Sequence, residues 1–465
     1  MREFIFPVRI ADCKCDTSAE NLLKKQPLQI GLSEEQIVTF LDGDYVILDF
    51  GKEMCGGARV LTFHSDKSKI RLRFGESLGE CCSDIGGEKN STNDHAPRDF
   101  EVFFPNYSDL TFGNTGFRFL RIDFCGKTKL KCVVAENNIL KRKAAYEYKG
   151  EDTRIAEIFK TAKRTVDLCA SSGYVWDGAK RDRLVWIGDM HPEMLALTTL
   201  YERVPEIERS LDFVREQTPL PKWMNTMPTY SLWWIIILAD YYKKTKRRSF
   251  ASRQLDYLEA LLIQLDLCIK ENGELNYPSY FVDWPTHERE DEKDGVRAIN
   301  IIAMKKAIDI LEEFRRDASL AKTLLERLLK IEISPKTSKQ VTALKYLATS
   351  LTDEDKARLT EGGARGMSTF MSYYILKAVA SFDKPRAIEM MKEYYGAMLD
   401  KGATTFWEDF DVEWAKNSCR IDEYPTEGQK DIHGDFGAFC YVGYRHSLCH
   451  GWSAGVIQFI AEECE

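Results

Sequence analysis

Long hydrophobic runs are absent from this sequence of 465 residues. The longest, residues 232 to 239, is far shorter than the roughly 20 apolar residues that cross a bilayer. The apolar stretch within residues 1 to 6 is likewise too short for a secretory signal. We therefore expect a protein of the cytoplasm that does not bind membranes.

An excess of positive charge is also missing. Lys and Arg number 65 against 73 Asp and Glu, which gives a formal net charge of -8 and argues against a nucleic acid as partner. The 13 cysteines are an odd number and lack the doubled spacing of a zinc site, so we expect thiols in a reducing compartment and no metal. The glycine-rich residues 362 to 366 lack the Lys-Ser/Thr of a phosphate loop, and we expect no cofactor.

Tryptophan does not occur in the first 150 residues, and all nine tryptophans lie between Trp176 and Trp452. The same 150 residues contain 22 basic and 22 acidic residues, so the acidic surplus belongs to the rest of the chain. These two compositions predict two domains, residues 1–145 and 146–465.

The first domain is predicted to be a β-sandwich. Apolar and charged residues alternate in residues 70 to 74 and 117 to 119, and residues 45 to 48 form a short apolar run. A period of two is typical of strands with one buried face. Turn signals such as Gly56-Gly57 and Gly86-Gly87 separate these segments. We predict an antiparallel sandwich.

Apolar residues in the second domain recur every three or four residues, which indicates amphipathic helices. The stripes cover residues 152 to 169, 192 to 202, 206 to 216, 231 to 244, 252 to 271, 298 to 315, 319 to 331, 338 to 348, 369 to 381, 384 to 399 and 447 to 462. This periodicity does not distinguish an open bundle from a closed helical toroid.

Residues 176 to 189 interrupt the helical pattern with three carboxylates, three neighbouring basic residues and two tryptophans. A loop of this composition over a cavity would offer acids for proton transfer and flat apolar faces for a sugar ring. A salt-bridged link between two helices would have the same composition, because runs of charge are usually solvated.

A second unusual segment begins with Gly402-Ala403-Thr404-Thr405 and continues through Trp407 and Glu408. From Glu408 to Asp435 there are nine acidic residues and three basic ones. Crowded carboxylates repel one another, so we expect at least one raised pKa, as a general acid requires near neutral pH. An acidic surface loop is the alternative.

Other candidates are weaker. Residues 280 to 287 could form an aromatic wall, although Asp283 could equally cap a turn. Trp233 could line a pocket while Trp234 packs in the core. His446 and His450 are four residues apart, but a metal would need a third ligand. We therefore interpret them as satisfied or sugar-contacting histidines.

Taken together, these segments resemble the α-L-rhamnosidase family. The stretches that carry the resemblance are Asp177-Gly178 through Arg181-Asp182-Arg183, Trp186-Ile187-Gly188-Asp189, Gly402 to Glu408, His446 to Gly451, and, in the first domain, residues 49–52, 73–77 and 115–119. Members of that family are inverting glycoside hydrolases with a β-sandwich before an (α/α)6 toroid. The resemblance covers residues 44 to 460 and implies the same architecture here.

The resemblance also implies roles for individual residues. Glu408 matches the family's general base, and Asp182 takes the place of its general acid. Asp177 and Asp189 match carboxylates that hold sugar hydroxyls, with Trp186 beside them. We extend the predicted sugar-binding set to Arg181, Trp233, Asp283, Trp284, Trp407 and His450.

The sequence departs from the family at Asp182, because the family's acid is usually a glutamate. We therefore keep two hypotheses. The first is an exo-acting enzyme that releases terminal α-L-rhamnose, or a related deoxy or pentose sugar, from glycosides or oligosaccharides. The second is a carbohydrate-binding protein of the same fold without catalysis. A lyase or phosphorolysis reaction on this scaffold is a further alternative, and the sandwich edges are compatible with a homodimer.

Overall fold

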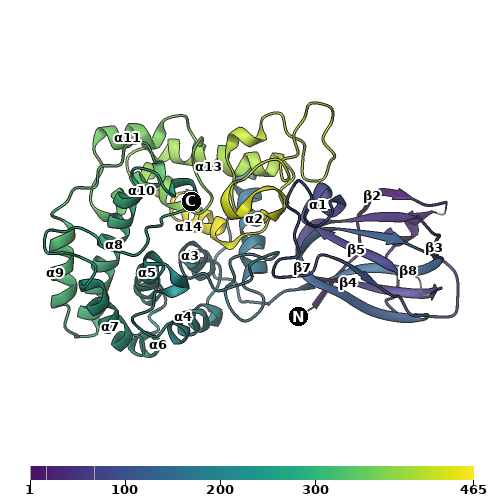
Figure 1. Cartoon of the computed structure of the whole chain (residues 1–465), viewed down its shortest axis with the longest axis horizontal. Helices are drawn as coiled ribbons and strands as arrows, with labels where there is room; N and C mark the ends of the chain where they lie inside the picture. Colours follow the sequence, from purple (N-terminus) through teal and green to yellow (C-terminus); the bar gives the residue numbers. More distant parts are fainter. Residues whose placement is uncertain (1, 17, 67–68, 465) are drawn as a thin grey trace.

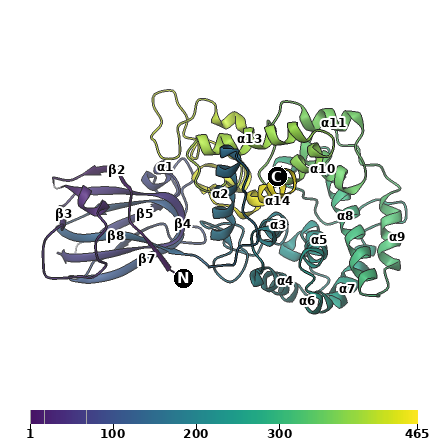
Figure 2. The same cartoon turned by 180° about the vertical axis from the view of Figure 1, so that it is seen from behind.

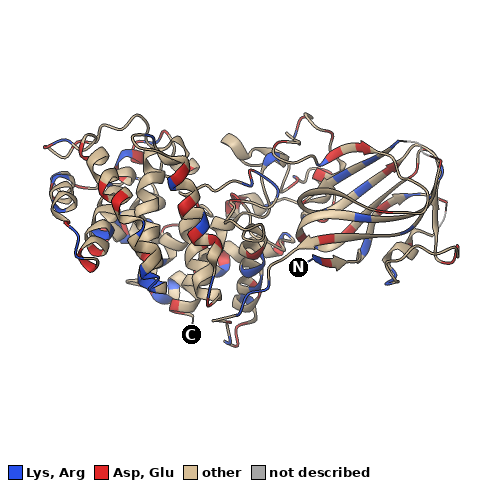
Figure 3. Cartoon of the chain, turned by 90° about the horizontal axis from the view of Figure 1, so that it is seen from below, with Lys and Arg blue, Asp and Glu red and all other residues tan. Residues whose placement is uncertain are grey.

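The computed structural model describes residues 2–16, 18–66 and 69–464. The strands lie at one end of the molecule and most helices at the other, with the late segment between α13 (Lys384–Asp400) and α14 (Val456–Glu463) packed where the two parts meet (Figure 1). The view from behind shows the same arrangement (Figure 2). Basic and acidic residues lie side by side on strands and helices (Figure 3).

In the described part of the chain, eight strands form one hydrogen-bonded antiparallel sheet, in the order β1-β8-β4-β7-β5-β6, with β2 paired to β4 and β3 to β8. Their bounds are β1 Arg2–Ile5, β2 Arg9–Lys14, β3 Val38–Phe40, β4 Tyr45–Ser65, β5 Ile70–Gly75, β6 Asp99–Val102, β7 Ser108–Phe124 and β8 Thr128–Asn138. The predicted strand segments fall in β4, β5 and β7, so the antiparallel β-domain is confirmed.

The alternation of residue types explains the packing of the sheet. In β5, Ile70, Leu72 and Phe74 are buried, whereas Arg71 and Arg73 between them are partly exposed. The buried faces form a core of aliphatic and phenylalanine side chains that belongs to this domain alone. The favourable free energy of burial is roughly proportional to the apolar area removed from water, so the packing of this buried face stabilises the sheet.

The rest of the chain is helical. The helices are α1 Leu78–Cys82, α2 Thr153–Cys169, α3 Met190–Leu200, α4 Pro205–Gln217, α5 Pro228–Thr245, α6 Arg248–Ser252, α7 Leu255–Asp266, α8 Glu292–Glu313, α9 Ser319–Leu328, α10 Lys339–Ala348, α11 Asp353–Thr360, α12 Ser372–Ala380, α13 Lys384–Asp400 and α14 Val456–Glu463. The helices from α2 onward share a second hydrophobic core, which extends from Ile155 to Ile460, whereas α1 packs against the β-domain through Leu78 and Cys81. No described helix is both long enough and apolar enough to cross a membrane.

Most predicted helices are confirmed, with two differences. The stripe at residues 447 to 462 is helical only from Val456, because residues 451 to 455 form a short 3-10 turn and Ser447 makes contacts described below. The stripe at 252 to 271 is helical from Leu255 to Asp266. The closure of the helices into a toroid and the domain boundary after residue 145 stay predictions.

Ionic contacts join the sheet to the loops of the helical part. Arg118 of β7 binds Asp49 through two nitrogens, ion-pairs with Asp422 at 3.1 Å and donates to the carbonyl of Gly402. The backbone N–H of Leu78 in α1 donates to the carbonyl of Ile421. The β-domain therefore packs directly against the segment that carries Glu408.

Candidate functional site

The loop that follows α2 is ordered by Asp177. Its carboxylate oxygens accept hydrogen bonds from the backbone N–H of Asp182 at 3.1 Å and of Leu184 at 2.9 Å. This local closure is possible because Arg183 adopts a left-handed backbone conformation, with φ of 62°. The turn directs the side chain of Arg181 into the protein and leaves Asp182 partly accessible.

The segment that carries Glu408 is held by the chain that precedes α14. The backbone N–H of Glu408 donates to the carbonyl of Ser447, and the N–H of Ser447 donates to the Glu408 carboxylate, both at 2.9 Å. Thr405 donates from its hydroxyl to the carbonyl of Leu448. These bonds fix the position of the buried Glu408 side chain.

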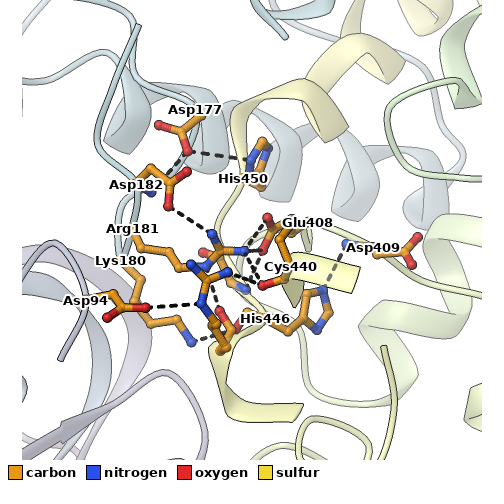
Figure 4. Close-up of polar contacts among 12 residues, drawn as sticks. Asp94, Asp177, Lys180, Arg181, Asp182, Glu408, Asp409, Cys440, His446 and His450 are labelled. Carbon is orange, nitrogen blue, oxygen red and sulfur yellow. Dashed lines mark hydrogen bonds and ion pairs between the residues drawn. The ribbon is translucent and has the colours of Figure 1, made fainter. Parts of the chain in front are cut away.

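Arg181 lies between the two predicted catalytic carboxylates (Figure 4). One terminal nitrogen contacts both oxygens of Glu408, at 2.6 and 2.8 Å, and the other contacts Asp182 at 2.9 Å. The guanidinium is planar with terminal nitrogens about 2.3 Å apart, so the nearest carboxylate oxygens of Asp182 and Glu408 lie within about 8 Å of each other. Two acids that are 226 positions apart in sequence, 408 minus 182, thus share one centre.

Burial shifts the pKa values of the carboxyl groups around this centre. Desolvation raises the pKa of Glu408, while the charge of Arg181 and the N–H of Ser447 act in the opposite direction. Burial raises the pKa of Asp177 and of Asp189 well above the usual range, and neighbouring carboxylates add to this effect. The pKa of Asp409 rises to about 8, chiefly through burial. A raised pKa in the acidic segment is confirmed, although burial contributes more than the repulsion that the sequence suggested.

The cavity beside Glu408 is small, about 10 Å³, which is enough for about one water molecule. Asp283, Trp284, Asp409 and Tyr441 are among its lining residues. The ring of Trp284 stacks on Phe439 with 5.3 Å between centroids. A sugar ring would need a larger space than this cavity offers.

Three further predicted residues lie next to the Asp182 loop. Trp186 donates from its indole nitrogen to Asp182 at 3.2 Å. Asp189 accepts a hydrogen bond from Tyr230 at 2.9 Å. Nε2 of His450 lies 3.9 Å from Asp177 and 4.0 Å from Asp189, and burial lowers the pKa of this histidine well below its usual value.

The other predicted aromatic residues lie elsewhere. Trp233 lines a different cavity of about 560 Å³ together with His191, and the two rings stack at 5.4 Å. Trp407 is buried in the helical core against Phe410 and does not line the Glu408 cavity. Helical and loop spacing could not distinguish these core positions from a pocket wall.

Asp283 lines the cavity, but its carboxylate oxygens already accept hydrogen bonds from neighbouring residues. They accept hydrogen bonds from the backbone and hydroxyl of Thr286 and, at 2.7 Å, from the hydroxyl of Ser368. Asp283 therefore caps the short 3-10 turn Trp284–Thr286, as the alternative interpretation of the sequence had it. Burial raises the pKa of this carboxyl.

Sequence reasoning missed two groups that contact the site. His95, from the loop before β6, places Nε2 3.1 Å from Asp182. Glu193 on α3 is buried, and burial followed by the charges of Asp189 and Asp177 raises its pKa well above the usual range. No spacing rule connects His95 to a loop 87 positions later, 182 minus 95, whereas Glu193 follows Asp189 by one helical turn and could have been found.

Among the described residues, one cluster contains residue types that could ligate a metal. A lysine side chain lies against it. Ligand atoms of Glu76, Glu80 and His433 lie within 4.8 Å of one another. The Lys180 ammonium, however, ion-pairs with Glu76 at 3.1 Å and with Glu80 at 3.0 Å. Both ring nitrogens of His433 also have partners, the Ser77 hydroxyl and the carbonyl of His446. A metal ion would have to displace Lys180.

No family model and no curated protein matches this sequence. Among solved structures, the chain is similar to a rhamnosidase from Klebsiella oxytoca with rhamnose bound, with a TM-score of 0.77 and 20% identity over 100% of this chain and 96% of that one. A family 78 rhamnosidase of Bacillus sp. GL1 gives a TM-score of 0.72 and 17% identity, over 95% of this chain and 48% of that one. An α-L-rhamnosidase from Dictyoglumus thermophilum gives 0.68 and 14%, over 92% of this chain and 51% of that one. The resemblance inferred from the sequence is thus confirmed at the level of the fold.

Proposed function

We propose that this chain, which shares the fold of α-L-rhamnosidases, is an exo-acting glycoside hydrolase. Its substrates would be glycosides or oligosaccharides that end in α-L-rhamnose or a related deoxy or pentose sugar. The observation that carries this proposal is the meeting of Asp182 and Glu408 around Arg181. The shared fold supports it, since a relative of this shape has been solved with rhamnose bound.

The proposed reaction inverts the anomeric carbon. Inversion requires a protonated carboxyl that donates to the leaving oxygen and a carboxylate that activates water on the opposite face, with about 6.5 to 9.5 Å between the two groups. The upper bound of about 8 Å between Asp182 and Glu408 is compatible with this range. In this mechanism Asp182 donates the proton and Glu408 deprotonates the water.

Arg181 would favour the ionised form of Glu408 against the effect of burial. Burial alone would favour the neutral carboxyl, whereas a guanidinium at 2.6 Å favours the charged form. The buried carboxyls of Asp177 and Asp189 would hold sugar hydroxyls, and Trp284 would provide an apolar face for the methyl group of a 6-deoxy sugar. The Asp182 donors His95 and Trp186 would orient the acid.

The same proposal includes features of the chain that lie outside the site. We infer an (α/α)6 toroid for residues 146–465, a two-layer sandwich for residues 1–145 and a cytoplasmic location. The change from strand-type to helix-type periodicity and the fold shared with α-L-rhamnosidases support the architecture, and the odd number of cysteines supports the location. A toroid of paired helices would place the Asp182 and Glu408 loops at the same end.

Replacing Glu408 by Gln should lower the turnover of an aryl α-L-rhamnoside by about 10² to 10⁴-fold, because the amide cannot accept the proton of water. The assay is release of the aryl group, with NMR of the first sugar anomer to follow inversion. Glu413→Gln is the matched control, since Glu413 is in the same acidic segment but ion-pairs with Lys416 at the surface. Full turnover in Glu408→Gln would refute the assignment.

A carbohydrate-binding protein without catalysis is the second candidate. Asp182 favours it, because aspartate is one methylene shorter than the family's usual glutamate and this carboxylate is held by Arg181. Calorimetry with rhamnose, combined with a prolonged hydrolysis assay on the same sample, separates the two candidates. Heat of binding without any product would support the second.

A further inference from the structure

A second cavity, of about 710 Å³, lies where the β-domain meets α2. Its lining includes Lys52 of β4, Lys160 and Arg164 of α2, and Thr404 of the segment before Glu408. It shares no lining residue with the small cavity beside Glu408. A volume in this range is typical of sites for small molecules.

Two of the five basic residues that line this cavity are neutralised by carboxylates. Arg154 contacts Glu157 at 3.2 Å and Asp400 at 2.6 Å. Lys163 contacts Asp167 at 2.9 Å. These ion pairs are structural and leave no unbalanced charge on this part of the wall.

Among the residues described, the other three basic residues make no ion pair shorter than 3.9 Å. The ammonium of Lys52 comes only to 3.9 Å from Glu3, and Lys160 has no hydrogen bond or ion pair in the described part of the chain. Arg164 donates to the backbone carbonyl of Glu53, while its Nε is buried without a hydrogen-bond partner. A buried donor without an acceptor is unfavourable, so this wall favours an anion.

Lys52 is also close enough to Arg164 and Lys160 to be repelled by both. Burial lowers the pKa of Lys52 and the charge of Arg164 lowers it further, whereas Glu3 acts in the opposite direction and Lys160 adds a smaller decrease. The Glu53 side chain is a poor counter-charge, because burial raises its pKa well above the usual range. An anion between the cations would relieve the repulsion and desolvation together.

We propose that this cavity binds a small molecule with a phosphoryl group, held by Lys52, Lys160 and Arg164. A phosphate dianion suits two ammonium groups and one guanidinium, which donates through fixed, planar N–H groups. The remaining volume would accept the rest of a molecule about the size of a sugar. The site is independent of the glycosidase proposal, because no residue of that mechanism takes part in it.

Thr404 connects the proposed site to the segment that carries Glu408. The Thr404 hydroxyl accepts a hydrogen bond from the backbone N–H of Glu53 at 2.8 Å, and Glu53 follows Lys52 directly. Glu408 follows Thr404 by four positions in the sequence, 408 minus 404. A ligand that moves Lys52 into the cavity would therefore shift β4, whose Glu53 is hydrogen-bonded to the segment before Glu408.

Calorimetry on the full chain at fixed low ionic strength tests the proposal, with inorganic phosphate, glucose 1-phosphate, glucuronate and glucose as separate probes. We expect saturable binding of phosphate and glucose 1-phosphate at one site, weaker binding of glucuronate and none of glucose. Absence of phosphate and glucose 1-phosphate binding would overturn the site. Glucuronate binding as tight as that of glucose 1-phosphate would overturn the phosphoryl assignment.

The variant Lys52→Gln/Lys160→Gln locates the binding. It should weaken phosphate binding by at least about tenfold, since a charge-assisted hydrogen bond contributes about 1.5 to 3 kcal/mol. Lys143→Gln/Lys416→Gln removes the same charge from exposed lysines and should leave binding unchanged. In phosphate-free buffer the first variant should unfold no earlier than the parent, because repulsion is relieved. Equal phosphate affinity in the two double variants would reject the location.

Discussion

At the residue scale, the shorter side chain at position 182 gives a test of the proposed acid. Asp182→Asn removes the proton donor, so the loss of turnover should be large for substrates with a poor leaving group. It should be small for nitrophenyl rhamnosides, whose leaving oxygen needs little protonation. Asp94→Asn is the control, because Asp94 contacts Arg445 at the edge of the same site. An equal loss on both classes of substrate would assign Asp182 another role.

Asp409 makes a separate prediction about stability and pH. Its pKa is about 8 in the folded chain and about 3.9 when unfolded. The folded state therefore binds more protons between these values, and the contribution of this group to stability is lost as pH rises from about 4 to 8. Asp409→Asn should lose less stability over that interval. Midpoints of thermal unfolding at pH 5 and pH 8 measure the effect, and parallel shifts in parent and variant would contradict it.

The fold brings the predicted polar residues together more closely than the predicted aromatic residues. The roles of Asp182 and Glu408 were predicted from the resemblance to the α-L-rhamnosidases, and both acids contact Arg181. Trp233 and Trp407 were assigned to the sugar site because aromatic rings suit both cores and pockets. The difference between the two depends on packing partners far away in sequence.

At the element scale, α11 shows what periodicity does not detect. This helix has few apolar residues and begins with a capping box, in which Thr352 and Asp355 exchange side-chain and backbone hydrogen bonds. Its stability depends on the cap and on the Lys345–Asp355 ion pair at 2.8 Å. A method that seeks apolar stripes therefore finds α10 and α12 and passes over the helix between them.

The cap of α11 can be tested directly. Thr352→Ala removes the hydroxyl that accepts the N–H of Asp355, and should lower the free energy of unfolding by about 1 kcal/mol. Chemical denaturation gives this value. Thr360→Ala, at the last residue of the same helix, removes a hydroxyl that bonds only to helix carbonyls and should cost little. Similar losses in both variants would mean that the cap is not the cause.

At the scale of the whole molecule, the β-domain supports the site through a buried ionic network. Glu76, after the end of β5, accepts hydrogen bonds from the N–H of Leu448 at 2.6 Å and the hydroxyl of Ser447 at 3.2 Å. Ser447 in turn holds Glu408. The sequence predicted two domains but not this connection, because the partners are 371 positions apart, 447 minus 76.

Lys180 neutralises the acidic side of this network. Its ammonium lies 3.1 Å from Glu76 and 3.0 Å from Glu80, and it donates to the carbonyls of Tyr444 and His446. All three charged side chains are buried. A buried carboxylate that loses its partner is strongly unfavourable, whereas a neutral replacement of the whole set can be tolerated.

Lys180→Met should therefore lower the free energy of unfolding by about 3 to 5 kcal/mol, because it leaves Glu76 buried without a counter-charge and Glu80 with only the more distant Arg98, at 3.5 Å. Adding Glu76→Gln to this variant should recover part of the loss, whereas Glu76→Gln alone should destabilise the parent. Denaturation of the parent, both single variants and the double variant gives the coupling free energy. Additive losses would show that Lys180 contributes by packing alone, and the β-domain would then hold the Glu408 segment without help from this charge.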